Sequence, residues 1–447
     1  MNIIEFIKKT SSSRKMILAF LGAAFLGSLI LMLPFCLQAG QKISFLTALF
    51  TITSAICVTG LSVVDVSKVF SVPGQIVILI FIQLGGLGIM TFSSMLFLIA
   101  GKKMTFHERM VLRDERNADS GEITDFIKKI FSTVFIIETI GAFILTMIFM
   151  DKMQYSFQKA LYYGVFHSVS AFCNAGFSLY SDSLESFSKN GILNLTIAYL
   201  IILGGIGFAV INSFIMAIRR DIKRFNLTSK LAIFISIILT FGGMLLIFIL
   251  EYNNPATIGN MKFIDKGIAS FFQSVTLRTA GFNTIPIGAM ESGTIFLSCI
   301  LMFIGASPGS TGGGIKTTTL GVLAFYVMGV VRGRENIEMF NRSIAWDILN
   351  RALAILVISI VYVGAVILLI LTSDGFRFEQ IVFEVISAFA TVGLSMGITS
   401  ELSIFARILI IMTMFIGRLG PLTFALAIGE TKRKERFAYP KENILVG

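Results

Sequence analysis

Charged residues, histidine, cysteine and tryptophan are all scarce in this sequence of 447 residues. Aspartate, glutamate, lysine and arginine make up 14% of it, whereas soluble domains usually carry about a quarter. Two histidines argue against a catalytic or metal-binding histidine cluster. The four cysteines are far apart and lie in or beside apolar runs, so they suggest neither a disulfide framework nor a metal knuckle. The abundant components, 55% hydrophobic residues and 40 glycines, are typical of a membrane protein with closely packed helices.

Long uncharged stretches recur along the chain. A helix needs about 20 apolar residues to cross the ~30 Å hydrocarbon layer. The first stretch is longer than the apolar region of a signal peptide, about 7–15 residues, and similar stretches follow, so we expect no cleaved signal. Eight stretches qualify as spans: 16–36, 72–100, 130–150, 191–218, 231–250, 293–331, 352–371 and 402–429. Four shorter stretches, which we expect to be re-entrant half-helices ending in glycine turns, lie at 44–57, 158–172, 264–277 and 378–390.

The four glycine turns repeat in register. Their central glycines are separated by 116, 105 and 112 residues, and a second glycine follows each of them 24 to 28 residues later. Two features kept in phase four times predict four diverged units in one chain, each made of a helix, a half-helix and a helix. The turns are Val58-Thr59-Gly60-Leu61-Ser62, Asn174-Ala175-Gly176-Phe177-Ser178, Thr279-Ala280-Gly281-Phe282-Asn283 and Thr391-Val392-Gly393-Leu394-Ser395.

The predicted fold is an all-α membrane protein in which four tandem units, each helix, pore loop, helix, surround a pseudo-fourfold pore. The units are expected at residues 1–100, 101–218, 219–331 and 332–430, followed by a cytoplasmic tail at 431–447.

The distribution of basic residues predicts the orientation. If the amino terminus is inside, the inner segments hold 25 lysines and arginines and the outer segments hold eight. By the positive-inside rule both termini are then cytoplasmic and the glycine turns face outward. The outer segments also carry ten acidic residues, a slight negative excess that should gather cations at the mouth.

The half-helices suggest a cation site. A half-helix that enters from outside and stops at mid-membrane aims the negative end of its dipole at the centre. Glycine then permits the backbone angles by which the following turn can direct its carbonyl groups toward an axis. Carbonyl oxygens that replace the hydration shell of an ion are the solution used by potassium-selective filters.

The fourth turn, Thr391-Val392-Gly393-Leu394-Ser395, resembles the threonine-valine-glycine-tyrosine-glycine filter of potassium channels. The four-unit arrangement resembles the Trk/Ktr/HKT superfamily of potassium transporters. With the segment Gly305 to Lys316, the chain is most similar over its whole length to the bacterial Ktr membrane subunit. The resemblance implies that dehydrated potassium binds to the carbonyls of Val58, Thr59, Gly60, Asn174, Ala175, Gly176, Thr279, Ala280, Gly281, Thr391, Val392 and Gly393.

Departures from the channel pattern leave selectivity open. In related plant proteins a serine at the first filter glycine goes with sodium transport, and this chain has Gly60 there. Only the fourth turn carries the full threonine-valine-glycine triplet, and leucine or phenylalanine replaces the aromatic tyrosine, so selectivity is expected to be looser than in a channel. Packing glycines between helices are the alternative for any single turn.

The third unit contains an interruption between Gly305 and Thr319 that is rich in glycine and hydroxyl residues and includes a proline. A helix cannot persist through it, so irregular backbone is expected inside the membrane. The alternative is a simple kink. The resemblance implies that this loop is the gate, formed by Gly305, Ala306, Ser307, Pro308, Gly309, Ser310, Thr311, Gly312, Gly313, Gly314 and Lys316, with Arg418 beside it.

Charged residues within apolar segments need partners. Arg418 is expected to be a barrier or latch for the loop, or a structural arginine that bonds loop carbonyls; Lys316 could compete with the ion for loop oxygens. Arg278 and Glu384 either pair behind the filter or occupy separate solvated positions. Glu138 either takes part in proton coupling or bonds neighbouring helices. His107 and His167 are interpreted as ordinary surface and packing residues.

The expected function is potassium uptake across the plasma membrane, with no enzymatic activity and no covalent cofactor. The transported ion is potassium, with a possible sodium dependence. The resemblance implies a homodimer above a cytosolic ring of nucleotide-binding, RCK-type regulatory subunits. Basic inner loops could dock that ring or bind lipid headgroups, and no nucleic-acid partner is expected. The alternatives are a sodium-permeable or sodium-coupled transporter of the same superfamily, a broken-helix secondary transporter and a membrane enzyme.

Overall fold

The computed structural model describes residues 12–88, 123–218, 225–334 and 337–429, and these are mostly helical. The tail at 431–447, most of the basic loop 102–129, and His107 lie outside the described residues. The helices are α2 (Ser12–Leu31), α3 (Phe45–Ile56), α4 (Val66–Val69), α5 (Val72–Leu87), α8 (Ile123–Met153), α9 (Phe157–Phe172), α10 (Gly191–Gly205), α11 (Phe208–Ile218), α12 (Leu227–Glu251), α13 (Phe263–Thr276), α14 (Ser292–Phe303), α15 (Thr317–Val331), α16 (Trp346–Ser373), α17 (Phe378–Ala390), α18 (Ile404–Leu419) and α19 (Pro421–Gly429).

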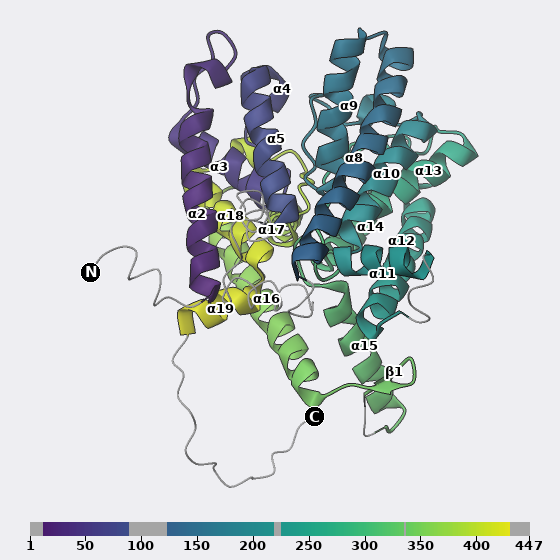
Figure 1. Cartoon of the computed structure of the whole chain (residues 1–447). Helices are drawn as coiled ribbons and strands as arrows, with labels where there is room; N and C mark the ends of the chain where they lie inside the picture. The colour runs from purple at the N-terminus through teal and green to yellow at the C-terminus, as the bar shows by residue number, and fades with distance from the viewer. Residues whose placement is uncertain (1–11, 89–122, 219–224, 335–336, 430–447) are drawn as a thin grey trace.

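The four predicted half-helices correspond to α3, α9, α13 and α17, which we call the short helices, and each follows a longer helix in the chain. Contacts join α3 to α2 and α5, α9 to α8 and α10, α13 to α12, and α17 to α16 and α18. Figure 1 shows the long helices running roughly side by side, with α9 and α4 toward one end and α19 and α15 toward the other. The four short helices thus each pack against the longer helix that precedes them.

The surface of the bundle is apolar. Phe135, Phe241 and Val361 each expose more than half of their surface, which is costly in water but not in a lipid bilayer. Among the described residues, three helical stretches are long and apolar enough to cross a membrane: Lys128–Met153, Leu227–Glu251 and Trp346–Ser373. The chain is therefore a mostly helical membrane protein. The prediction of eight spans stays a prediction, since the span at 72–100 continues beyond the described residues.

One predicted span is bent. The stretch 191–218 forms α10 and α11, which meet at an angle of 99° and would count as one broken span. Gly207, at the break, has a φ of 99°, and a Cβ there would lie 2.6 Å from the Pro308 carbonyl oxygen. Phe208 N–H also donates to Gly309 O at 3.0 Å. The bend is thus held by contact with a segment 101 residues further along the chain.

The predicted interruption of the third unit is present between α14 and α15. Helix α14 ends at Phe303 and α15 begins at Thr317, so the irregular segment is 304–316, which we call the α14–α15 loop. The predicted bounds of 305–319 ran three residues too far because Thr317 to Thr319 form the first turn of α15, with Lys316 as its N-cap.

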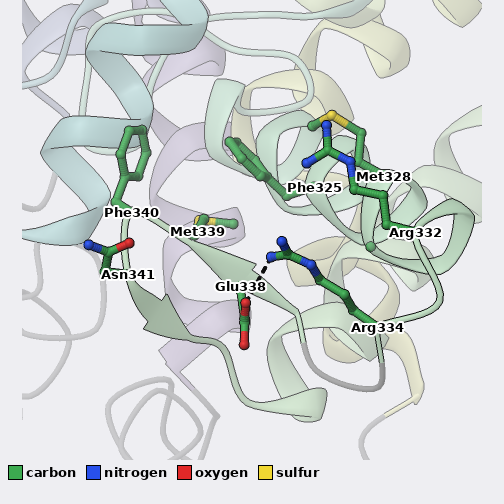
Figure 2. Close-up of a pocket in the computed structure, with 9 residues that line it drawn as sticks. Phe325, Met328, Arg332, Arg334, Glu338, Met339, Phe340 and Asn341 are labelled. Carbon is green, nitrogen blue, oxygen red and sulfur yellow. Dashed lines mark hydrogen bonds and ion pairs between the residues drawn. The ribbon is translucent and has the colours of Figure 1, made fainter.

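A small hairpin follows α15. Its strands β1 (Glu338–Met339) and β2 (Arg342–Ser343) pair antiparallel. A cavity of about 210 Å³ lies between the hairpin and the end of α15. Figure 2 shows Phe325, Met339 and Phe340 gathered around it, with the ion pair of Arg334 and Glu338, 2.8 Å between Nη1 and Oε2, at its edge. The hairpin lies at the same end of the molecule as α19 (Figure 1).

Candidate functional site

The four predicted filter turns share one unusual backbone conformation. The first residue of each has a positive φ although it is not glycine, and so does the glycine two residues later. A left-handed conformation costs an L-residue roughly 1–2 kcal/mol, and such strain is concentrated at functional sites. The φ angles are 57° at Val58, 59° at Asn174, 67° at Thr279 and 53° at Thr391, then 96° at Gly60, 67° at Gly176, 79° at Gly281 and 92° at Gly393.

Hydrogen bonds fix the direction in which these turns point their carbonyl groups. In each turn the N–H of the middle residue donates back to the short helix that precedes it. Because a trans peptide directs its N–H and C=O in opposite senses, the carbonyl of the first turn residue points away from that helix. The bonds are Thr59 N to Ser54 O, Ala175 N to Ser170 O and Val392 N to Ser387 O, each 2.8 Å, and Ala280 N to Thr276 O, 3.0 Å.

Serine side chains extend this pattern in the first and fourth turns. Gly60 N–H donates to Ser54 Oγ at 2.9 Å, and Gly393 N–H donates to Ser387 Oγ at 3.1 Å. The carbonyls of the middle residues in these turns therefore also point away from the short helices.

The four glycines close a ring. A Cβ on Gly60 would lie 2.6 Å from Ala175 O, and one on Gly176 would lie 2.8 Å from Ala280 O. In the same way Gly281 lies against Val392 O, and Gly393 lies against Thr59 O. Each glycine thus touches the carbonyl oxygen of the next turn, in chain order, and the last touches the first. The predicted filter residues come together from four distant segments, and no side chain fits at any of the glycines.

A second glycine follows each ring glycine by 24 to 28 residues, and three of these four second glycines pack against the ends of the short helices. Gly85, Gly204 and Gly417 lie directly against carbonyls in the last turn of the short helices, those of Ile56, Phe172 and Phe389. The second glycine of the third unit differs, because Gly305 lies against Gly313 of the α14–α15 loop instead. These glycines let the longer helices approach the ends of the short ones.

We expect Gly417→Ala to destabilise the folded protein, because its Cβ would overlap Phe389 O and overpacking costs about 1–3 kcal/mol. The measurement is the Tm of the purified protein in detergent. Gly364→Ala is the matched control, since nothing lies within 4 Å of a Cβ at that helical glycine. An equal Tm for both variants would contradict the packing role.

A cavity of about 380 Å³ opens on one side of the ring. It is lined by the residues that follow the glycines, among them Leu61, Phe177 and Leu394, and by Asp65. Partial burial works to raise the pKa of Asp65, but hydrogen bonds from Ser181 and Ser67 hold it below its usual value. A negative charge therefore persists at the mouth of the ring in mild acid.

The α14–α15 loop lies against the other side of the ring. Gly313 N–H donates to Thr391 Oγ1 at 3.0 Å, and Gly312 lies against Thr279 Oγ1. Thr391 and Thr279 are the first residues of the fourth and third glycine turns. Thr311 N–H donates to Gly204 O at 3.2 Å. The loop is thus hydrogen-bonded to the second and fourth predicted units and packs against the filter turn of its own unit, the third.

Two basic side chains hold the α14–α15 loop. Arg418 of α18 donates to Thr311 O through Nη1 and to Gly85 O through Nη2. Lys316 Nζ donates to Gly312 O at 2.8 Å. Arg418 therefore joins the loop to α5 and links the fourth predicted unit to its neighbour in the ring, the first unit.

The other charged residues have local partners. Arg278 Nη2 donates to Ser236 Oγ at 2.9 Å, and Glu384 accepts from Ser395 Oγ at 2.7 Å. Both side chains are at least nine-tenths buried. The suggested pairing of Arg278 with Glu384 is therefore wrong, and so is the solvated alternative, because each finds hydroxyl partners on a neighbouring segment.

Glu138 bonds between helices. Gln83 Nε2 of α5 donates to Glu138 Oε2 of α8 at 3.3 Å. Cys173 Sγ lies 3.9 Å from Glu138 Oε1. These contacts fit the helix-bonding alternative for Glu138.

Sequence reasoning missed the contact of His167. Its Nε2 lies 3.1 Å from Ser178 Oγ, two residues beyond Gly176. The signal was present in the sequence, because His167 precedes its glycine by nine residues, as Glu384 precedes Gly393.

Comparison with known proteins identifies relatives over the whole chain. The TrkH family model, described as "Cation transport protein", matches residues 12–435. The chain is 41% identical to Ktr system potassium uptake protein B of Bacillus subtilis, covering 100% of this chain and 98% of that one. It is 37% identical to potassium/sodium uptake protein NtpJ of Enterococcus hirae, covering 94% of each.

A solved structure has the same fold. The potassium transporter TrkH from Vibrio parahaemolyticus superposes with a TM-score of 0.72, covers 94% of this chain and 85% of its own, and is 19% identical. The family and these relatives are transporters, and none is an enzyme. The expectation that the chain has no enzymatic activity is thereby confirmed.

Proposed function

The chain belongs to the TrkH family of cation transport proteins and is a KtrB-type member of the Trk/Ktr superfamily, and from this premise we propose that it is the potassium-conducting subunit of a Ktr-type uptake system. Potassium would enter through a pore surrounded by four units, each helix, pore loop, helix. The proposal rests above all on the closed ring of four glycine turns with their carbonyls directed away from the short helices.

The ring suits a dehydrated monovalent cation. Its ligands would be neutral carbonyl oxygens that replace the hydration shell. The carboxyl ends of the four short helices add a negative potential there, because a helix dipole carries about half a negative charge at that end. The filter in this proposal is the twelve residues of the glycine turns, 58–60, 174–176, 279–281 and 391–393.

The α14–α15 loop and Arg418 would form the gate. The loop lies against the ring and is held by hydrogen bonds to α10, to Thr391 of the fourth glycine turn and to α18. An ion leaving the ring on that side would meet the loop and the positive charge of Arg418. Removal of these contacts would open the path.

The direction of transport follows from the predicted orientation. With both termini in the cytoplasm, the cavity beside Asp65 would open outward and the loop would face the cytosol. The negative interior of the cell would then drive potassium inward through the plasma membrane. A pathway of this kind needs control, which we assign to a separate cytosolic ring of nucleotide-binding, RCK-type subunits beneath a homodimer of this chain.

The docking surface for the regulatory subunits would lie at the cytoplasmic end of the molecule. The cavity between α15 and the hairpin (Figure 2) lies at that end, and α15 continues directly from the loop. Arg332 and Arg334 line it. Basic residues there would bind an acidic partner surface, or anionic lipid headgroups.

A sodium-dependent variant is the second candidate function. The printed name of the Enterococcus hirae relative includes both potassium and sodium. Sodium would be transported with potassium or would stimulate its transport, and separate flux measurements of the two ions distinguish these cases.

The test is growth and ion flux in a bacterial strain that lacks its own potassium uptake, with a Ktr regulatory subunit supplied. We expect growth at low potassium, and uptake of Rb⁺, used as a substitute for K⁺, that stops when the membrane potential is abolished. Normal membrane insertion with neither growth nor Rb⁺ uptake would contradict the proposal and favour a transporter for another solute.

A further inference from the structure

The positions nine residues before the four ring glycines form a set. All four lie on the short helices and are buried, with at most 1% of the residue exposed at His167 and Glu384. Their chemistry differs, because the second and fourth carry a titratable side chain whereas the first and third do not. In chain order they are Thr51, His167, Phe272 and Glu384.

Glu384 ties α17 to the segment that leaves the fourth turn. Its carboxylate accepts hydrogen bonds from Ser395 Oγ, at 2.7 Å, and from Thr399 Oγ1. Ser395 lies two residues after Gly393, and its Oγ also accepts from Gly397 N–H at 3.0 Å. The backbone beyond the glycine is therefore held to the short helix by one buried carboxylate.

His167 makes the equivalent contact in the second turn. Its Nδ1 lies 2.8 Å from Tyr163 O, which can only accept, so Nδ1 is the donor and carries the proton. Nε2 then accepts from Leu179 N–H at 3.4 Å and lies 3.1 Å from Ser178 Oγ. Ser178 follows Gly176 by two residues, as Ser395 follows Gly393.

The first and third turns are built differently. Thr51 Oγ1 donates to Thr47 O within its own helix, at 2.9 Å, and Ser62 Oγ donates to Val64 O at 2.6 Å. Phe272 offers no polar atom. Because each ring glycine touches the next in chain order, the second and fourth turns face each other across the axis.

We infer that His167 and Glu384 are positioning residues. They hold the backbone that follows Gly176 and Gly393, on opposite sides of the ring of glycine turns, and thereby set the discrimination of the ring between potassium and sodium. The inference rests on the proposed function. Each side chain fixes the distance between a short helix and the backbone that follows the glycine. Without it that backbone can move, and a ring that adapts its size no longer separates ions of different radius.

The test compares Rb⁺ and Na⁺ uptake per inserted molecule in variants of Glu384. Glu384→Ala removes both acceptors, whereas Glu384→Gln keeps one acceptor oxygen and nearly the same volume. Since a hydrogen bond to a charged group is worth on the order of a tenfold change, we expect the Rb⁺/Na⁺ ratio to fall about tenfold in Glu384→Ala and less in Glu384→Gln. Rb⁺ uptake should remain measurable in both.

Partner and control variants separate positioning from folding. Ser395→Ala removes one of the two hydrogen bonds that Glu384 accepts and should also lower the Rb⁺/Na⁺ ratio. The loss in the Ser395→Ala, Glu384→Ala double variant should be smaller than the sum of the two single losses, because the two residues share a contact. His167→Phe keeps a ring among its aromatic neighbours Phe149 and Tyr180 but removes the acceptor, and should also lower the ratio. Thr51→Val is the matched control and should keep the wild-type ratio.

A wild-type Rb⁺/Na⁺ ratio in Glu384→Gln, Ser395→Ala and His167→Phe, whatever their expression or Tm, would overturn the inference. So would an equal loss of selectivity in Thr51→Val. Failure of the proposed function is a different result, namely the absence of Rb⁺ uptake in the wild-type protein.

Discussion

Gly60→Ser is expected to lose the preference for potassium over sodium while the protein still inserts into the membrane. Gly60 has a φ of 96°, and a Cβ there would lie 2.6 Å from Ala175 O. The added side chain thus displaces a carbonyl oxygen of the neighbouring turn, and the left-handed backbone costs a further 1–2 kcal/mol, roughly. Because about 1.4 kcal/mol is a factor of ten, we expect at least a tenfold fall in the K⁺/Na⁺ flux ratio.

The measurement is the uptake of K⁺ and Na⁺ by cells that express equal amounts of inserted protein. Gly364→Ala again serves as the control, because it adds a methyl group at a glycine with nothing near it. An unchanged flux ratio in Gly60→Ser would mean that the ring packs helices together and does not select ions.

Deletion of residues 310–314 is expected to produce uptake that no longer depends on the regulatory subunit. These residues carry the contacts of the α14–α15 loop to the ring, including Gly313 N–H to Thr391 Oγ1, and Thr311 O is an acceptor for Arg418. Removing them clears the inner side of the ring. Without the regulatory subunit, we expect Rb⁺ uptake to rise at least about tenfold, the change that a loss of roughly 1.4 kcal/mol of gate stability would cause.

Arg418→Ala should raise the same basal uptake to a smaller extent, because the loop keeps its bonds to Gly204 and Thr391. Arg418→Lys keeps the charge but replaces the planar guanidinium, which bonds the two carbonyls through separate nitrogens, by a single nitrogen. It therefore distinguishes a barrier that depends on charge from a latch that depends on this geometry. Arg351→Ala, which changes an exposed arginine of α16, is the control. Unchanged basal uptake in both the deletion and Arg418→Ala would contradict the gate.

The short helices were predicted closely from the sequence. The stretch 378–390 is α17 without any change, and the bounds of the other three differ by at most one residue at each end. The reason is local, because α3 begins at its cap Ser44, whose Oγ accepts from Thr47 N–H at 3.2 Å, and each short helix ends at a strained turn before a glycine. The length of an apolar stretch and the residues of the turns that flank it are therefore enough to predict the bounds of such helices.

Contacts between distant segments could not be predicted in the same way. The bend at Gly207 depends on Pro308 and Gly309 of the loop, and no feature of 191–218 alone requires it. Arg278 and Glu384 were expected to pair or to be solvated because opposite charges and water are the usual partners at membrane depth. The partners they have are hydroxyl groups of Ser236, Ser395 and Thr399, which apolar periodicity does not reveal.

The most direct test of the ring is to locate an ion in it. Rb⁺ resembles K⁺ and scatters X-rays anomalously, so crystals of the protein grown in Rb⁺ report its position. We expect anomalous peaks on the axis between the carbonyls of Thr59, Ala175, Ala280 and Val392. An ordered ring without any Rb⁺ peak, in protein that transports Rb⁺ in vesicles, would show that the ions take another path.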